Sequence, residues 1–240
     1  MKKLMTILLV FAMLLGLCAC GSSAGEDAPK DGLQVGYARE HFTPTIPTPL
    51  GGAGNAETRL SSGFVDYIYA TCVAFKDKDS NTVLMYHMDI LNTYDSLYNY
   101  IPTIASETGV PEDNIILAAT HNHSAPSINS TKTPYMDDYR TMFYMALVTA
   151  GKEALKDLAP AEMYIASSKP ENMVFVRHYV RDDGYIHGEG GNAAEADRYV
   201  GHAAPADNDL QMIKFTRKDK KDVVLVNWQG HPRAHAERNI

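Results

Sequence analysis

The stretch NIILAATHNH, residues 114–123, is an apolar, strand-like run that ends in two histidines. In an extended backbone the side chains of residues i and i+2 point to the same side, so we expect His121 and His123 to face one point. Neutral imidazole is a good ligand for zinc. Because a single histidine on a strand is more often a core residue, the pair alone is a moderately specific metal signal.

Two other strand-like runs also end in groups that can bind a cation. Residues 223–228 read VVLVNW and lead to His231, and residues 82–86 read TVLMY and lead through His87 to Asp89. In open α/β sheets, ligands bind beyond the carboxyl ends of the strands, so three such ends can converge. We therefore expect a metal site that contains the histidine pair and His231.

The rest of the chain alternates between strand and helix patterns, which indicates an α/β domain over residues 33–240 with a mixed β-sheet layered with helices. Residues 67–75 and 82–88 form a predicted hairpin, and residues 182–205 are rich in glycine and alanine and are predicted to be a long loop. The remaining predicted strands are 33–38, 114–119, 163–167, 210–216 and 223–228, and the predicted helices are 94–108 and 135–158.

Composition narrows the class of protein. The 240 residues are 45% hydrophobic and 21% charged, which is ordinary for a globular domain. The net charge is −7 and there is no basic stripe, so we expect no nucleic-acid partner. Three cysteines without CxxC or finger spacing exclude a disulfide scaffold and a zinc ribbon.

The N-terminus has the pattern of an export signal. Lys2 and Lys3 precede an apolar run over residues 4–17, and LCACG follows at residues 17–21. This resembles a bacterial lipobox, which implies a lipoprotein signal peptide at 1–19, lipidation of Cys20 and a flexible tether at 20–32. The protein would then lie in the bacterial cell envelope, outside the cytoplasm and attached to the membrane by its acyl chains. A plain secretory signal and an uncleaved anchor helix are the alternatives.

Two further features are predicted to be structural. The glycine cluster at 51–54 has no helix pattern or Lys-Ser/Thr pair after it, so we interpret it as a turn with close backbone approach and not as a phosphate site. Cys72 lies in an apolar run and is predicted to be a small buried hydrophobe.

At its histidine motifs the chain resembles the neutral (non-lysosomal) ceramidase family, specifically the N-terminal part of the catalytic domain. The family carries Thr-His-Thr-His-Ser-Gly-Pro, where this chain has THNHSAP at 120–126, and Trp-x-x-His-Pro, where this chain has WQGHP at 228–232. VGYAR at 35–39, PLGG at 49–52 and FVRHY at 175–179 extend the likeness over about residues 33–235.

The resemblance implies a zinc-dependent amidase that cleaves the N-acyl bond of ceramide, a lipid-like substrate, through a zinc-activated water. It implies that His121 and His231 are zinc ligands. His123 would be catalytic, in contact with the attacking water or the substrate, and Arg177 would be a polar contact near the reacting amide.

The main departure from the family is the ligand set. The family's two other ligands, a Glu and a Tyr, have no counterpart here, and a catalytic zinc normally has three protein ligands. We expect either that the chain is an incomplete catalytic domain or that Asp89 or His235 takes a ligand position. Asp89 is also a candidate acceptor of a hydrogen bond from a ligand histidine.

Two other functions stay open. One is a zinc hydrolase of another amide or ester, because the departures at Asn122 and Ala125 lie inside the histidine motif and weaken the inference of substrate. The other is a non-catalytic surface lipoprotein built on an eroded enzyme scaffold, which the intact histidines oppose.

Overall fold

The computed structural model describes residues 32–52, 59–130, 136–188 and 191–232. The predicted signal peptide, Cys20 and nearly all of the predicted tether lie outside these residues, as does His235, so what the sequence indicates about them stays a prediction. Within the described ranges, no helix is both long and apolar enough to cross a membrane.

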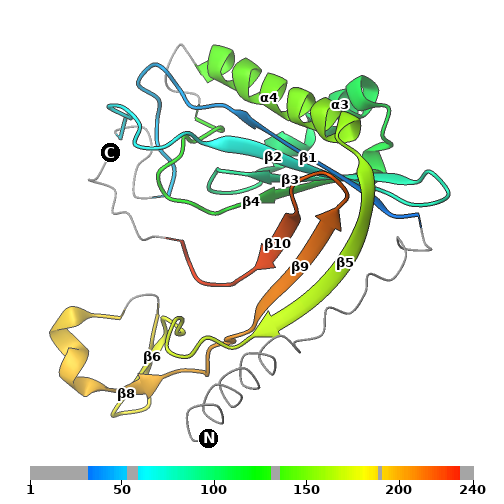
Figure 1. Ribbon diagram of the computed structural model, residues 1–240. Helices are drawn as coiled ribbons and strands as arrows, with labels where there is room; N and C mark the ends of the chain where they lie inside the picture. Colours follow the sequence, from blue (N-terminus) through cyan, green and yellow to red (C-terminus); the bar gives the residue numbers. More distant parts are fainter. Residues whose placement is uncertain (1–31, 53–58, 131–135, 189–190, 233–240) are drawn as a thin grey trace, which may run out of the picture. The chain divides into compact units, whose positions relative to one another are not determined.

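One mixed β-sheet forms the centre of the fold (Figure 1). Its strands are β1 (Gln34–His41), β2 (Tyr69–Lys76), β3 (Thr82–Met88), β4 (Ile115–Ala119), β5 (Ala159–Ser168), β9 (Leu210–Arg217) and β10 (Val223–Asn227). They are ordered β10-β9-β5-β1-β2-β3-β4, so β4 and β10 are the two edges. β3 and β4 are parallel and every other neighbouring pair is antiparallel. The predicted mixed sheet and the predicted hairpin are confirmed.

Helices cover one face of this sheet (Figure 1). Helix α4 packs against β1 and β2, and α3 packs against α4. The predicted long helix is confirmed, but the single helix predicted over 94–108 is wrong: two helices occupy this stretch, because Pro102 lacks the N–H that a continuous helix would need there. The bounds are α2 (Asp95–Tyr98), α3 (Ile101–Thr108) and α4 (Met136–Lys156), with a 3₁₀ turn at Glu112–Asn114.

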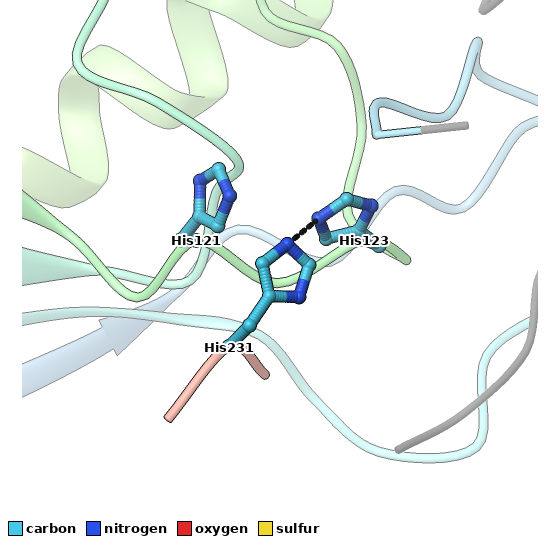
Figure 2. Close-up of side chains that lie close together, drawn as sticks. All are labelled: His121, His123 and His231. Atoms are coloured by element: carbon cyan, nitrogen blue, oxygen red, sulfur yellow. Dashed lines mark hydrogen bonds between the residues drawn. The ribbon is translucent and has the colours of Figure 1, made fainter. Parts of the chain in front are cut away.

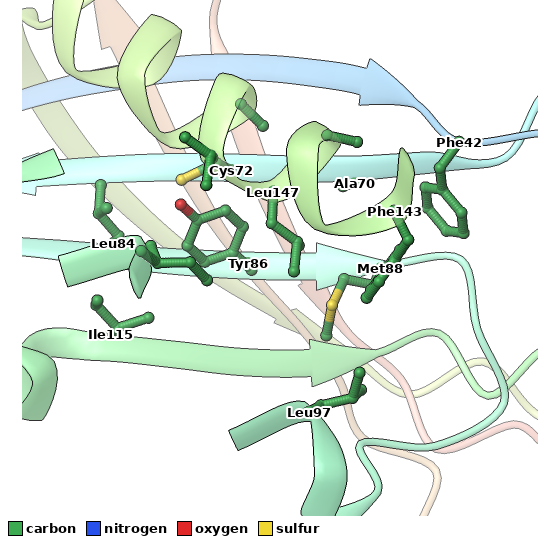
Figure 3. Packing of buried hydrophobic residues seen from close by; sticks show 14 of the residues in the cluster. Phe42, Ala70, Cys72, Leu84, Tyr86, Met88, Leu97, Ile115, Phe143 and Leu147 are labelled. Atoms are coloured by element: carbon green, nitrogen blue, oxygen red, sulfur yellow. The ribbon is translucent and has the colours of Figure 1, made fainter. Parts of the chain in front are cut away.

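The main core lies between α4 and the strands β2, β3 and β4 (Figure 3). Phe143 and Leu147 of α4 are fully buried against the sheet, and Phe143 meets the ring of Phe42 edge-on at 4.8 Å between centroids. The close approach of α4 to β1 requires glycine at position 36, because a Cβ there would lie 1.9 Å from the carbonyl oxygen of Ala154. Burial of this apolar surface is the main term that holds the helix layer on the sheet.

The sheet bends sharply, so that β9 approaches β2 on the face opposite the helices. Phe75 of β2 and Phe215 of β9 are separated by β1 and β5, so their strands would lie about 14 Å apart in a flat sheet. Their ring centroids are 5.4 Å apart, inside a second apolar cluster that also contains Val35 and Val223. The bend occurs in β5, which pairs with β1 only at Ala159 and Pro160 and then pairs with β9 along the rest of its length.

A buried arginine stabilises this bend. The side chain of Arg217, which is 4% exposed, forms an ion pair with Asp157 at the end of α4. Its Nε donates to the carbonyl of Lys221 at 2.8 Å and its Nη1 to the carbonyl of Val35 at 3.3 Å. Asp157 also accepts from Lys220 Nζ at 2.7 Å. Arg217 therefore joins β9, β1 and the α4–β5 connection.

The stretch 182–205, predicted to be a long loop, is structured instead. It contains β7 and β8, which pair with β6 just before it in a three-stranded sheet of order β7-β6-β8, and a 3₁₀ turn precedes β8. This region is stabilised by ion pairs of Arg181 and Arg198 with Asp183 and by the stacking of Tyr179 on Tyr199. Such contacts leave no periodic pattern of apolar residues in the sequence, so the pattern could not predict them. The bounds are β6 (Tyr179–Arg181), β7 (Ile186–His187), the 3₁₀ turn (Ala193–Arg198) and β8 (Tyr199–His202).

The arginine at the bend gives a stability prediction. We expect Arg217→Met to lower the free energy of unfolding by about 2 kcal/mol, because it removes the buried guanidinium that donates to the carbonyls of Val35 and Lys221 and pairs with Asp157. The matched control is Lys214→Met on the same strand, whose ion pair with Asp222 is exposed and is worth less than about 1 kcal/mol. Urea unfolding measures both, and equal effects of the two changes would contradict the role of Arg217 at the bend.

The buried cysteine gives a reactivity prediction. Cys72 is fully buried, and burial raises the pKa of its thiol to about 12. At pH 8 only about one thiol in ten thousand is then ionised, so a thiol reagent should not modify it in the native protein. With Cys18 and Cys20 replaced by serine, we expect one reactive thiol per chain in urea and none without it. Rapid modification of Cys72 in the native protein would contradict this prediction.

Candidate metal centre

His121 stands immediately after β4, at the parallel pair of strands. The N–H of Thr120 donates to Met88 O at 2.9 Å and that of His121 to Ile90 O at 3.1 Å, so the end of β3 holds the end of β4. His121 has φ +58°, a left-handed conformation that costs an ordinary residue about 1–2 kcal/mol. The extended geometry predicted for the histidine pair is therefore wrong, and a turn, not a strand, aims these rings.

The ring of His121 is oriented by the loop after β3. Its Nδ1 lies 2.8 Å from Leu91 O and 3.1 Å from Asn92 Oδ1. A carbonyl oxygen only accepts, so Nδ1 carries the proton and donates it. The lone pair of Nε2 then points away from this loop as a metal ligand.

His123 is oriented in the same way by the glycine cluster. Its Nδ1 donates to the carbonyl oxygen of Gly52. Gly52 has φ +96°, and a Cβ at this position would lie 2.6 Å from His123 Nδ1, so only glycine fits. The turn with close backbone approach that we predicted for this cluster is thus present at Gly51 and Gly52, whereas Ala53 and Gly54 lie outside the described residues.

His231 completes the group from the opposite edge of the sheet. It follows β10, and its Nε2 lies 3.1 Å from Nε2 of His123 (Figure 2). The ring centroid of His231 is 5.1 Å from that of His121 and 4.6 Å from that of His123. The three residues each offer a ligand nitrogen, and these nitrogens lie within 4.8 Å of one another.

This donor set fits a zinc ion. Zinc–nitrogen bonds of ~2.0–2.1 Å place two ligands of a tetrahedral ion about 3.3 Å apart, close to the 3.1 Å between His123 and His231. Two of the rings have their other nitrogen on a backbone carbonyl, which is the usual support of a zinc-bound histidine. His231 is exposed, so a fourth position can reach solvent or substrate.

Comparison with known proteins bears on the fold. No protein-family model matches the sequence, and no curated protein matches it. Among solved structures, neutral ceramidase from Pseudomonas aeruginosa matches with a TM-score of 0.58 and 14% identity over 84% of this chain. A second structure, a ceramidase complexed with C2, matches with a TM-score of 0.58 and 15% identity over 80%.

The fold resembles that of the neutral ceramidases. The structural neighbours thus confirm the resemblance seen in the sequence, at the level of the fold. This chain spans about a third of their length, since it covers 32% and 30% of the two chains.

The other predicted site residues, Asp89 and Arg177, are not part of the three-histidine cluster. Asp89 accepts from the N–H of Tyr69 at 2.9 Å, and burial raises the pKa of its carboxyl. The Nδ1 atoms of His121 and His123 lie on backbone carbonyls, so Asp89 is not the acceptor at either atom. Arg177 is half-buried in the connection between β5 and β6, and its place beside the amide stays a prediction.

The departures from the ceramidase motif have local structural roles. Asn122 Nδ2 donates to Thr120 Oγ1 at 3.0 Å, and its Oδ1 accepts from the N–H of Ser124 at 3.2 Å. Ala125 is buried, and its carbonyl accepts from the N–H of Gly51 at 2.9 Å. Both residues shape the turn that carries the histidines.

Sequence reasoning missed Asn92 and Arg59. Asn92 contacts His121, and Arg59 Nη2 donates to His123 O at 2.8 Å. Neither residue lies in a motif or at a predicted strand end, so only the three-dimensional arrangement finds them.

The histidine cluster gives a prediction about zinc binding. We expect one tightly bound zinc per chain, and a loss of affinity of more than about 100-fold in His121→Ala, His123→Ala and His231→Ala, because loss of an outer partner alone costs about 10–100-fold. The matched control is His87→Ala, an exposed histidine on β3. Competition with a chromogenic chelator gives the affinities. Unchanged binding in all three variants would place the metal elsewhere.

Proposed function

We propose that this chain is the zinc-binding part of a hydrolase that cleaves an N-acyl amide bond, with ceramide as its substrate. The observation that carries the proposal is the meeting of three imidazole nitrogens, from both edges of a ceramidase-like sheet, at one point. Because the chain spans about a third of its structural neighbours, the activity of the whole protein is part of the proposal.

In this mechanism His121, His123 and His231 would hold the zinc. A zinc ion bound there would lower the pKa of a coordinated water toward about 7 and would polarise the carbonyl of the amide. The carbonyls of Leu91 and Gly52 keep the protons on Nδ1 of His121 and His123, so that both Nε2 lone pairs remain available. We place Arg177 near the reacting amide as a polar contact, on the strength of its sequence motif. The sequence resemblance gives His123 a role at the attacking water; we assign it to the zinc instead, because its Nε2 lies 3.1 Å from that of His231.

Membrane attachment through lipidated Cys20 also belongs to the proposal. It is supported by the lipobox-like sequence LCACG and by a lipid substrate that lies in a membrane. An anchored enzyme on the outside of a bacterial membrane would meet ceramide without extracting it first.

A second candidate substrate is a smaller, more polar N-acyl compound. A cavity of about 510 Å³ is lined in part by Asn92, whose Oδ1 lies 3.1 Å from Nδ1 of His121, on the side of the ring opposite the metal-facing Nε2. Its lining is mostly polar, with Thr93, Asp95, Ser96 and Asn129 next to Asn92 and Tyr94. Such a lining suits a hydroxyl or amide group better than an acyl chain, since apolar chains gain most from apolar walls.

The activity test compares substrates on the full-length protein. We expect release of fatty acid from a fluorescent ceramide, loss of this activity with a strong zinc chelator, and recovery when zinc is added back. An N-acyl amino acid and an aryl ester are run in parallel. Ceramide hydrolysis that persists unchanged without metal would reject the mechanism, and selective cleavage of the N-acyl amino acid would favour the second candidate.

A further inference from the structure

Arg59 lies beside the metal cluster and joins two segments of it. Its Nη2 donates to Gly51 O at 2.9 Å and to His123 O at 2.8 Å. Hydrogen bonds from a guanidinium are charge-assisted and stronger than those between neutral groups. A single half-buried side chain thus ties the backbone of a histidine to the glycine turn that holds the ring of the same histidine.

The glycine turn is held on several sides. Leu50 N–H donates to Arg59 O at 2.8 Å, Gly51 N–H to Ala125 O at 2.9 Å, and Ser127 N–H to Pro49 O at 2.7 Å. The carbonyl groups of Gly51 and Gly52 face the histidine motif. Gly51 O is occupied by Arg59, and Gly52 O by His123 Nδ1.

Several independent contacts fix the backbone and the ring of His123. Arg59 holds its backbone carbonyl, the Gly52 carbonyl holds its Nδ1, and there is no room at Gly52 for any side chain. The ring has one direction left for Nε2, which is toward His231. The preorganisation of a ligand by outer hydrogen bonds raises metal affinity.

We propose that Arg59 is a positioning residue that sets zinc affinity by locking His123, through the Gly51–Gly52 turn, with its Nε2 aimed at the metal. The inference rests on the metal site of the proposed function. It adds that the turn and its arginine are part of the zinc site, although neither contacts the ion.

The test measures zinc affinity by chelator competition in the full-length protein. We expect zinc to dissociate about 10–100-fold more readily from Arg59→Ala, and Arg59→Lys to recover part of this loss because an ammonium still donates to carbonyls. Gly52→Ala should weaken binding by a similar factor, because its Cβ would displace the ring. Thermal unfolding of the metal-free proteins separates this effect from simple destabilisation, and Gly52→Ala tests the lock if Arg59→Ala does not fold.

Arg140→Ala is the matched control, since Arg140 Nη1 donates to the carbonyls of Ile128 and Ser130 without contact to the histidines. Its zinc affinity should equal that of the wild type. In a His123→Ala background, Arg59→Ala should have no further effect on affinity, because Arg59 acts through that ring.

Two different results would overturn the inference. If the wild type binds no zinc, the proposed metal site and the role of Arg59 both fail. If the wild type binds zinc and Arg59→Ala and Gly52→Ala bind it equally well, the metal site stands and only the positioning role is wrong. An additive loss in the double variant would likewise show that Arg59 does not act through His123.

Discussion

The site depends on one geometric constraint: the two edges of a seven-stranded sheet must end at the same point. In a flat sheet, six strand spacings would separate β4 from β10 by about 29 Å, yet the rings that follow these strands are 5.1 Å apart between centroids. The bend in β5 brings the two edges together. The apolar cluster around Phe215 and the Arg217–Asp157 pair stabilise this bend, so packing far from the histidines determines whether the three rings meet.

This constraint couples stability to metal binding. An ion that joins residues from both edges stabilises the folded sheet, because the unfolded chain has no such preformed site. In the other direction, any change that relaxes the bend separates His231 from the other two rings and weakens binding. The buried position of Arg217 fits this purpose, since a guanidinium forms hydrogen bonds to several carbonyls at once and stays charged when buried.

Local sequence patterns predicted the strands of the main sheet, the long helix and the three histidines that lie together, because alternation and helical spacing record which side of an element is buried. They could not predict the bend, since Phe215 and Phe75 are ordinary apolar residues whose contact is set by tertiary packing. They also missed the small sheet formed by β6, β7 and β8, where ion pairs between Arg181, Arg198 and the acids around them replace an apolar core.

The supporting groups of the site were hardest to see in the sequence for a physical reason. Two of the three rings are held by backbone carbonyls, at Gly52 and Leu91, and every residue has a carbonyl, so residue type carries almost no signal there. The exception is the glycine, whose missing side chain is itself the requirement. A glycine pair at a predicted turn is therefore informative when a histidine motif lacks the carboxylate that usually orients it: the backbone supplies the acceptor, and only a residue without Cβ allows the ring to reach it.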